Sequence, residues 1–356
     1  PHNLGEVVDA CLAYADDPEI SIEGLMKFVE GPDFPTGGLI FGRAGIRQAY
    51  HTGRGSVVVR ARAAFEELRK DREAIVVTEI PYQVNKSRMM ERIAELVHEK
   101  KIEGISDLRD ESDRDGVRVV IELKRDAIGE VVLNQLYRYS SLQTSFGVNM
   151  LALNGGKPGV MNLKEVIAAF VVFREEVITR RTVYLLGKSR DRAHILVGLA
   201  IAVANIDPII ELIRKAKDPA AAREALTARA WPTKDARPLI ELIADPRQSV
   251  DNSGNCRLSD EQAKAILELR LQRLTAMERD KLGDELHSIV DDIKRYIGIL
   301  HDPEMLKNVL REGLRVAREK FADPRRTELV EHEFEHNVED LIQREEMVVT
   351  LSHAGY

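Results

Sequence analysis

The sequence predicts an α+β domain followed by a long antiparallel coiled coil that ends in a small helical globular tip. Residues 1–158 mix segments of period two, typical of strands, with segments of helical period. Apolar residues three and four apart then run through 163–192 and 259–302, close to a heptad seam. Charged residues make up 31% of the chain and aromatic residues 5%, which favours salt-bridged helices over an all-β design.

Composition limits the classes of function. A length of 356 residues suggests two or three domains, and a net charge of -7 excludes a generally basic nucleic-acid binder, so such binding needs a local patch. Two cysteines, Cys11 and Cys256, form no disulfide framework and fit a reducing cytoplasm. No apolar run approaches the roughly 20 residues of a membrane span.

The α+β domain begins its regular pattern at SVVVRAR, residues 56–62. Val57, Val59 and Ala61 share one face of this expected strand, and its other face is expected to be wet and basic. Residues 74–80 are predicted to be its hairpin partner. We further expect helices at 87–100, capped by Asn85, and at 127–139, and strands at 117–123 and 148–153.

The helical part is predicted to form two arms, 159–195 and 259–302, around a tip at 196–258. The second arm opens with a capping box, Ser259 to Gln262. An arm of about thirty helical residues would be about 45 Å long. A terminal helix and linker are expected at 303–336, with the helix ending at Phe321, and 337–356 as the first strand of a truncated C-terminal domain. The chain has no initiator Met and stops after a strand-like segment, so we expect a fragment of a longer protein.

Residues 42–55, GRAGIRQAYHTGRG, raise the question of what the glycines and arginines bind. The stretch from Gly37 to Ala44 nearly matches a phosphate-binding loop, but Arg43 and Ala44 stand where Lys and a hydroxyl are needed, so we do not expect nucleotide binding.

Two further motifs suggest metals. Glu111, Asp113, Asp115 and Glu122 almost spell an EF-hand loop, but a strand pattern comes next instead of a helix, which favours an acidic turn. The HExxH motif at 332–336 could hold zinc on a helix, but it lies in an acidic linker without an evident third ligand. We therefore expect neither a metal ligand nor a catalytic residue in this chain.

The arginines carry the functional prediction, because no Asp or Glu occurs from Phe34 to Phe65 in an otherwise acidic chain. Arginine forks match phosphate oxygens, and a helix N-terminus also favours anions. We expect a surface that grips a phosphate backbone with little base reading, and the alternative is a solvated basic face. The expected DNA-binding residues are Arg43, Arg47, His51, Arg54, Arg60, Arg62, Asn85, Lys86 and Arg88.

Longer segments resemble a known family. EGPDFPTGGLIFGRAGIRQAYHTGRG, TEIPYQVNKSRMMERIAELV, NIDPIIELIRKA, EQAKAILELRLQRLTAMERDKL and DPRRTEL are similar, in order, to the tower region and the coiled-coil region of the A subunit of bacterial DNA gyrase, a type IIA topoisomerase. The resemblance covers nearly the whole chain, and it implies that the α+β domain is tower-like. The A subunit of topoisomerase IV, which decatenates DNA, is the alternative within the family.

The resemblance implies a part of an isomerase that cuts one duplex, passes a second through it and reseals the first with ATP, introducing negative supercoils. The tyrosine nucleophile would lie in a winged-helix domain upstream, so this chain alone should be inactive. No cofactor is expected here, because Mg²⁺ and ATP would belong to the gyrase B subunit in an A2B2 heterotetramer. The expected location is the bacterial cytoplasm, at the chromosome.

The same resemblance implies a homodimer through the tip, which would form an exit gate. The expected gate residues are Leu196, Leu199, Ile266, Leu269, Leu271 and Leu274. A hypothesis from a different class is a non-enzymatic architectural protein, in which a DNA-binding head and a coiled-coil arm hold duplexes without chemistry.

Overall fold

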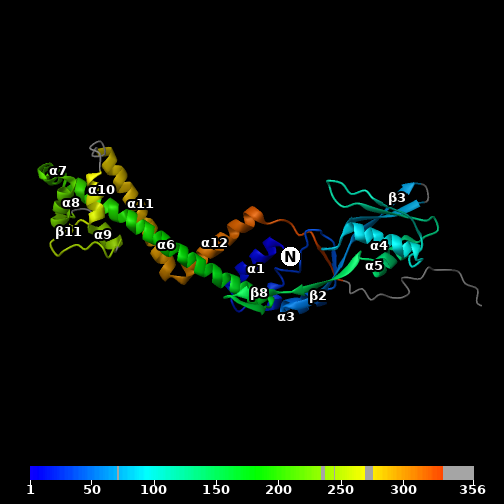
Figure 1. Ribbon diagram of the computed structural model, residues 1–356. Coiled ribbons are helices and arrows are strands. Elements are labelled where there is room, and N and C mark those ends of the chain that lie inside the picture. Colours follow the sequence, from blue (N-terminus) through cyan, green and yellow to red (C-terminus); the bar gives the residue numbers. More distant parts are fainter. Residues whose placement is uncertain (70–71, 234–236, 244, 269–275, 332–356) are drawn as a thin grey trace, which may run out of the picture. The chain divides into compact units, whose positions relative to one another are not determined.

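The computed structural model describes residues 1–69, 72–233, 237–243, 245–268 and 276–331 (Figure 1). The chain divides into two compact units. Pro1–Val171 and Gly313–Tyr356 form the first unit, and Val172–Glu312 forms the second. The long helix α6 and the helix α12 each contribute residues to both units.

The first unit is the α+β part of the chain. Its helices are α1 (Leu4–Asp16), α2 (Ile22–Leu25), α3 (Ala44–Thr52), α4 (Lys86–His98) and α5 (Gly129–Tyr139), with the first residues of α6 (Leu163–Ala204) and the last residues of α12 (Pro303–Phe321). Its strands are β1 (Leu39–Phe41), β2 (Arg54–Arg60), β3 (Arg62–Arg69), β4 (Arg72–Glu79), β5 (Ile105–Asp110), β6 (Val119–Leu123), β7 (Gln143–Asn149), β8 (Leu151–Asn154), β9 (Lys157–Val160) and β12 (Glu328–Val330).

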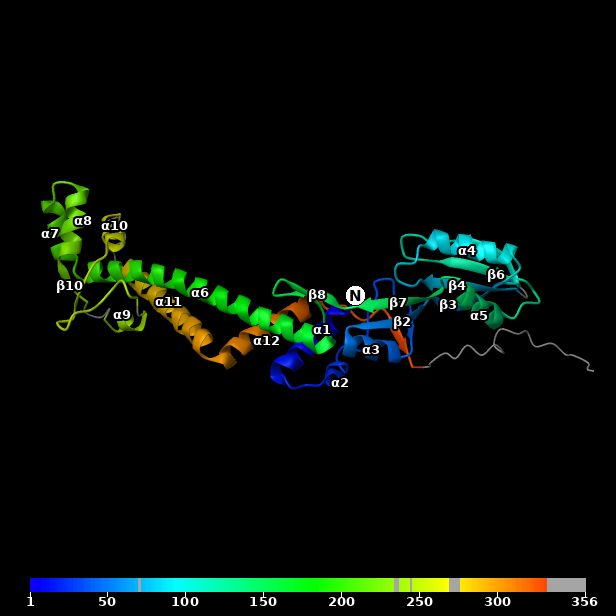
Figure 2. The same ribbon diagram turned by 60° about the horizontal axis from the view of Figure 1, so that its bottom comes forward.

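These strands form two four-stranded sheets and a small hairpin, β8–β9. The sheet β12-β1-β2-β7 holds the glycine-rich segment, and the sheet β3-β4-β6-β5 carries α4 and α5 (Figure 2). Residues 74–77 of β4 alternate between two apolar clusters: Ile75 and Val77 pack with Met89 and Ile93 of α4, and Ala74 and Val76 pack on the opposite face. Period two therefore fixes which face of the sheet receives the helices.

The strand β12 comes from the far end of the described chain and completes the first sheet. It pairs in parallel with β1, so that Ile40 lies opposite Leu329. The preceding loop is fixed by Thr327, whose buried hydroxyl accepts a hydrogen bond from the Phe34 amide at 2.7 Å, and by Arg325, which forms a 2.6 Å ion pair with Glu6. The sequence pattern predicted only a linker here.

The strand predictions at 56–62 and 148–153 were wrong in extent. At each place the chain leaves one sheet and enters another: β2 ends at Arg60 and β3 begins at Arg62, while β7 ends at Asn149 and β8 begins at Leu151. The predicted hairpin with 74–80 exists, but its first strand is β3, whereas β2 pairs with β1 and β7.

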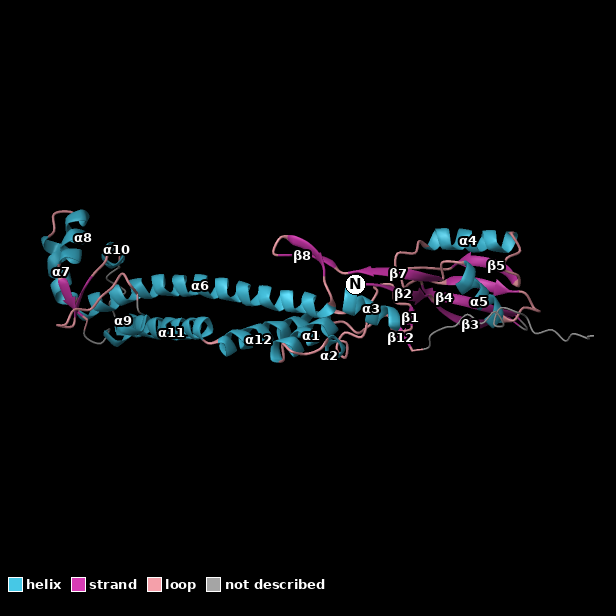
Figure 3. Cartoon of the chain, turned by 90° about the horizontal axis from the view of Figure 1, so that it is seen from below, coloured by secondary structure: helices cyan, strands magenta, loops and turns pink. Residues whose placement is uncertain are grey.

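The second unit contains the coiled coil and the tip. Besides the rest of α6 and the start of α12, it has α7 (Ile206–Lys215), α8 (Pro219–Ala228), β10 (Ala230–Pro232), α9 (Arg237–Ile243), β11 (Asn255–Arg257), α10 (Asp260–Leu267) and α11 (Ala276–His301). Helices α6 and α11 lie side by side in antiparallel directions (Figures 1 and 3). Their contact is apolar, and it includes Leu186, Val197, Leu286 and Ile293. The predicted fold class is thus confirmed.

Helix α6 is longer than expected, because it continues through Gly187 and reaches Ala204 as 42 residues. At 1.5 Å per residue it is about 63 Å long. The predicted caps are confirmed: Ser259 and Gln262 form a capping box on α10, and Asn85 caps α4. Among the described helices, none alone has the length and apolar composition of a membrane span; α6 with α7 passes such a test only as a pair bent by 92°.

Candidate nucleic-acid interface

The segment GRAGIRQAYHTGRG folds as a turn after β1, helix α3 and the start of β2. Gly42 and Gly53 take left-handed φ values of 76° and 75°, which suit glycine, and helix α3 lies between them. The stretch that resembled a phosphate-binding loop therefore contains strand β1 rather than a loop.

Helix α3 presents its cations on one face. Arg43 occupies the N-cap position without a capping hydrogen bond, and Arg47 and His51 come after it at intervals of four residues, so the three side chains share a face. The opposite face is buried and is anchored by Tyr50, whose hydroxyl lies 2.9 Å from Nε2 of His2. Burial raises the pKa of the Tyr50 phenol far above its usual range, so this anchor is uncharged.

The cationic face of α3 borders a hollow of about 360 Å³ that also contains acids. Glu23, Met26, Lys27 and Glu30 line it together with Arg43 and Arg47. Glu23 lies 3.0 Å from Nε2 of His51, and Glu30 lies 3.9 Å from Arg43. Carboxylates that come just before the acid-free window in the sequence therefore contact its cations.

Arg60 does not belong to an exposed basic face, which corrects the expectation for β2. The residue is 5% exposed. Its guanidinium stacks 4.1 Å from the ring centre of Phe41 and 4.3 Å from that of Tyr137, and its Nε donates a 2.7 Å hydrogen bond to Gln143. Burial lowers the pKa of Arg60, and the aromatic rings stabilise the cation inside the unit. The side chain is therefore not accessible to a phosphate.

Arg62 is exposed but paired. Its Nε lies 3.2 Å from Glu79, and its terminal nitrogen lies 2.9 Å from Glu328 of β12. Arg43 has a second partner from the same segment, since Glu331 lies 3.3 Å from its guanidinium. Sequence patterns did not indicate Glu328 and Glu331 as partners, because each lies more than 260 residues from its arginine along the chain.

The second basic point lies at the amino end of α4. The side chain of Asn85 accepts a hydrogen bond from the Arg88 amide at 3.1 Å, so its oxygen is used in capping. Lys86 lies 2.7 Å from Asp110, and this hydrogen-bonded contact lowers the pKa of Asp110 to about 2. Arg88 points to solvent.

The predicted cations therefore differ in how free they are. Within the described residues, Arg47, Arg54 and Arg88 have no carboxylate within ion-pair distance, and all three are exposed. Arg43, His51, Arg62 and Lys86 are exposed or half-buried and paired, and Arg60 is buried.

The acidic turn that resembled an EF-hand is held by arginines. Glu111 pairs with Arg109 and Arg118, and Glu122 contacts Arg109. The segment leads into strand β6, as the period-two pattern predicted. No group of three metal-binding side chains forms among the residues that the structure describes, and the HExxH motif lies outside those residues.

Three of the expected gate residues lie in or next to the core of the tip. Leu196 is 1% exposed and Ile266 is 5% exposed, both within the second unit's own cluster, against which Leu199 packs. Leu269, Leu271 and Leu274 lie outside the described residues. The resemblance thus pointed to apolar positions, but Leu196 and Ile266 are covered by their own unit.

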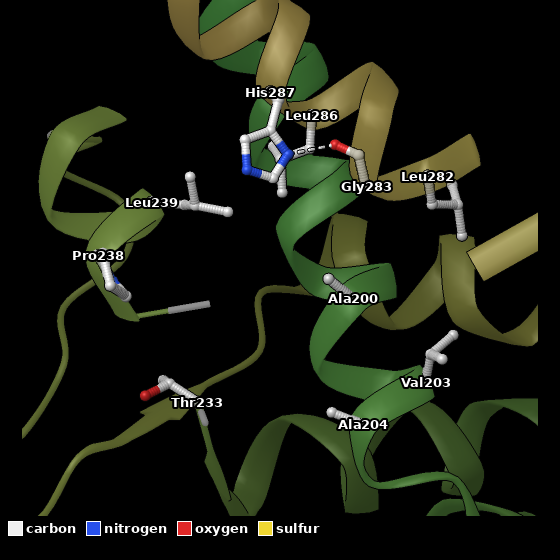
Figure 4. Close-up of a pocket in the computed structure, with 10 residues that line it drawn as sticks. All are labelled: Ala200, Val203, Ala204, Thr233, Pro238, Leu239, Leu282, Gly283, Leu286 and His287. Carbon is white, nitrogen blue, oxygen red and sulfur yellow. Dashed lines mark hydrogen bonds between the residues drawn. The ribbon is translucent and has the colours of Figure 1, made fainter. Parts of the chain in front are cut away.

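An apolar hollow of about 590 Å³ opens beside these positions (Figure 4). Ala200, Val203 and Ala204 of α6 line one side, and Pro238 and Leu239 of α9 line the other. The His287 ring stands at one end, where its Nδ1 lies 2.7 Å from the Gly283 carbonyl.

Comparison with known proteins assigns the chain to a class. The profile of the DNA gyrase/topoisomerase IV A-subunit family matches residues 1–315, and the chain belongs to this family. The predicted resemblance is thus confirmed.

Individual relatives agree with this assignment. The DNA gyrase A subunit of Rickettsia bellii is 57% identical over 356 residues, which is all of this chain and 39% of that protein. The gyrase A subunits of Salmonella typhimurium and Pseudomonas aeruginosa are 53% and 52% identical over the whole chain, which covers 42% and 40% of their lengths. The chain therefore spans about two fifths of the curated relatives it matches.

Proposed function

We propose that this chain is the part of a bacterial DNA gyrase A subunit that holds duplex DNA beside the cleavage site and forms an exit gate. The observation that carries the proposal is the set of exposed arginines Arg47, Arg54 and Arg88, which have no carboxylate partner among the described residues, in a family member with a net charge of -7. Guanidinium groups bind phosphate oxygens, so these three side chains would position the duplex without reading its bases.

The complete enzyme would carry out ATP-dependent strand passage and negative supercoiling. In that assembly, two A subunits would join two B subunits, which would supply the sites for Mg²⁺ and ATP, in the bacterial cytoplasm. This chain would contribute binding and gating and no chemical step. Topoisomerase IV remains the alternative, because the family profile includes both enzymes; the Rickettsia bellii and Salmonella typhimurium relatives favour gyrase.

DNA binding can be tested with a triple variant that breaks no ion pair among the residues that the structure describes. Arg47, Arg54 and Arg88 changed together to Glu should weaken binding of a fluorescent duplex at least about tenfold, because three phosphate contacts become repulsive. The wild-type affinity should fall steeply as salt rises. The measurement is fluorescence anisotropy at several salt concentrations.

A matched control carries the same change of charge in the second unit. Arg181, Arg214 and Arg257 are exposed there and have no carboxylate within ion-pair distance among the described residues, and changing them to Glu alters the net charge equally. Unchanged duplex affinity in the first triple variant, or an equal loss of affinity in both triple variants, would contradict the assignment of this surface to DNA.

We also propose that the gate is a homodimer contact through the tip, in which a second copy covers the apolar hollow. The proposal is supported by family membership and by the small apolar side chains of α6 that line the hollow. Ala200→Glu preserves helix propensity but places a charge on this surface. Sedimentation should show a dimer for the wild type at micromolar concentration and a monomer for the variant; a monomeric wild type would contradict the gate.

A further inference from the structure

Two acids of one segment contact two of the cations assigned to DNA. Glu328 lies in β12 and pairs with Arg62 at 2.9 Å, and Glu331 comes directly after β12 and pairs with Arg43 at 3.3 Å. We propose that β12 and the residue after it, Glu331, form a built-in competitor of DNA, which occupies Arg62 and Arg43 until phosphates displace its carboxylates. The inference rests on the proposed DNA-binding function.

The position of the competing acids is fixed by the backbone. The Glu328 amide donates to the Gly38 carbonyl, and the Gly42 amide donates to the Val330 carbonyl, each at 3.0 Å. Upstream, the Thr327 amide donates to Asp33 at 2.9 Å. The two carboxylates are therefore presented to the arginines at a defined register instead of reaching them by chance.

The pairs themselves are open to exchange. The Glu328 and Glu331 side chains are 58% and 79% exposed, and those of Arg62 and Arg43 are 39% and 52% exposed. Exposed pairs of this kind are weak and are screened by salt. The Glu328 carboxylate contacts the charged fork directly, at 2.9 Å, and this hydrogen bond is the leading cause that raises the pKa of Arg62.

Carboxylate and phosphate bind the same guanidinium fork, so the two ligands exclude each other at each arginine. Arg62 keeps Glu79 as a second partner and Arg43 keeps Glu30, at 3.2 and 3.9 Å. Loss of the β12 contact would therefore leave each arginine in place while freeing part of its fork. The opposite role, in which the acids only orient the arginines for DNA, predicts a change of affinity of the opposite sign.

The test measures duplex affinity by fluorescence anisotropy for the full chain with Glu328→Gln, Glu331→Gln and both changes. Glutamine preserves shape and the backbone pairing, and Glu331 lies beyond the last residue of β12, so its replacement leaves the strand register intact. Each single variant should bind about two- to fivefold more tightly, as expected for release of one exposed ion pair. Weaker or unchanged duplex binding in both single variants would overturn the proposal that these acids compete with DNA.

A double-mutant cycle separates competition from general charge repulsion. In an Arg62→Gln background the effect of Glu328→Gln should vanish, because its target is gone. Glu319→Gln, an exposed acid of α12 in the same unit, should change affinity less than twofold. An effect of Glu328→Gln that persists without Arg62, or that Glu319→Gln reproduces, would show repulsion only and would overturn the proposal.

The two proposals fail separately. A wild-type chain that does not bind duplex DNA overturns the proposed function, whereas a chain that binds DNA but ignores the β12 acids overturns only the competitor. Circular dichroism should show the same melting temperature for Glu331→Gln as for the wild type, so a change in affinity reports on binding and not on folding.

Discussion

A carboxylate contact at the surface of the first unit differs in kind from one buried in the second unit. The pair of Arg43 and Glu331 lies at the surface, with side chains that are 52% and 79% exposed. In the second unit, His194 and Asp245 are 1% and 4% exposed, and Arg247 clamps the same aspartate through two nitrogens. Burial removes water as an alternative partner. The exposed pair of Arg43 and Glu331 can therefore exchange ligands, whereas the buried contacts of Asp245 can only stabilise the fold.

The buried cluster joins three segments of the tip. Nε2 of His194 lies 2.7 Å from the hydroxyl of Ser259, and Gln262 donates to the His194 carbonyl at 2.7 Å. Nδ1 of His194 lies 3.2 Å from Asp245 without the alignment of a hydrogen bond. The cluster thus connects α6, the loop before β11 and the start of α10.

The largest effect should come from breaking this cluster. Asp245→Ala leaves His194 and Arg247 without their shared carboxylate, and we expect the free energy of unfolding to fall by about 3 kcal/mol. Fluorescence of Trp231, the single tryptophan of the chain and a buried part of the tip, reports urea unfolding of the second unit. Glu241→Ala, which removes an exposed partner of Arg237, should cost less than about 1 kcal/mol. Equal costs for the two variants would contradict the comparison.

The second effect concerns pH and the anchor of α3. Burial lowers the pKa of His2 to about 4, below the usual 6.5. The folded state therefore binds fewer protons than the unfolded state between these values, so stability is present above pH 6.5 and is lost as pH falls towards 4. We expect a loss on the order of 2 kcal/mol between pH 7 and pH 4.5.

His2→Gln isolates this contribution, because glutamine offers Tyr50 a polar partner but does not titrate. Urea unfolding followed by circular dichroism should show a smaller acid loss in this variant than in the wild type. His98→Gln, at an exposed position of α4, is the control. Burial also lowers the pKa of His194, so the second unit should lose stability in the same direction. An acid loss that His2→Gln leaves unchanged would assign the effect to other groups.

Sequence predicted the elements whose causes are local. The period of α4 and α5 and the capping residues Asn85 and Ser259 lie within a few residues of what they determine. The pairing of β12 with β1 joins segments nearly 290 residues apart, and no local pattern encodes it. The family resemblance indicated Leu196 and Ile266 as gate residues, but the apolar character of a position does not say whether the same unit or a second copy covers it.

The surface proposed to bind DNA could be predicted from the sequence to a similar extent. The absence of acids from the sequence around α3 indicated this helix and the residues on either side of it. Arg47 and Arg54 are indeed unpaired among the described residues. Alternation alone placed Arg60 beside Arg62 on a wet face. The strand ends between them, however, and the residue that belongs to the first sheet turns towards Phe41 and Tyr137.

Arg60 provides a third, smaller test because it is a buried cation in the unit whose other predicted binding cations are exposed or half-buried. Arg60→Leu removes two stacked contacts and the hydrogen bond to Gln143, and should cost about 1–2 kcal/mol of unfolding free energy. Duplex affinity should change less than twofold. Arg47→Leu should have the opposite effects, with weaker duplex binding and nearly unchanged stability. Urea unfolding and fluorescence anisotropy, both measured on both variants, test this difference. Weaker binding in Arg60→Leu at full stability would return this residue to the interface.

A smaller loss of stability than at Arg60 is expected at Arg62, two residues further along the chain. Arg62→Gln loses two exposed ion pairs, to Glu79 and Glu328, and should cost less than about 1 kcal/mol, because water replaces each partner. Urea unfolding by circular dichroism, with Arg60→Leu measured in parallel, compares two arginines separated by a single residue. A cost at Arg62 equal to that at Arg60 would mean that its pairs with Glu79 and β12 support the fold. In that case they could not be the exchangeable contacts from which phosphates displace the carboxylates.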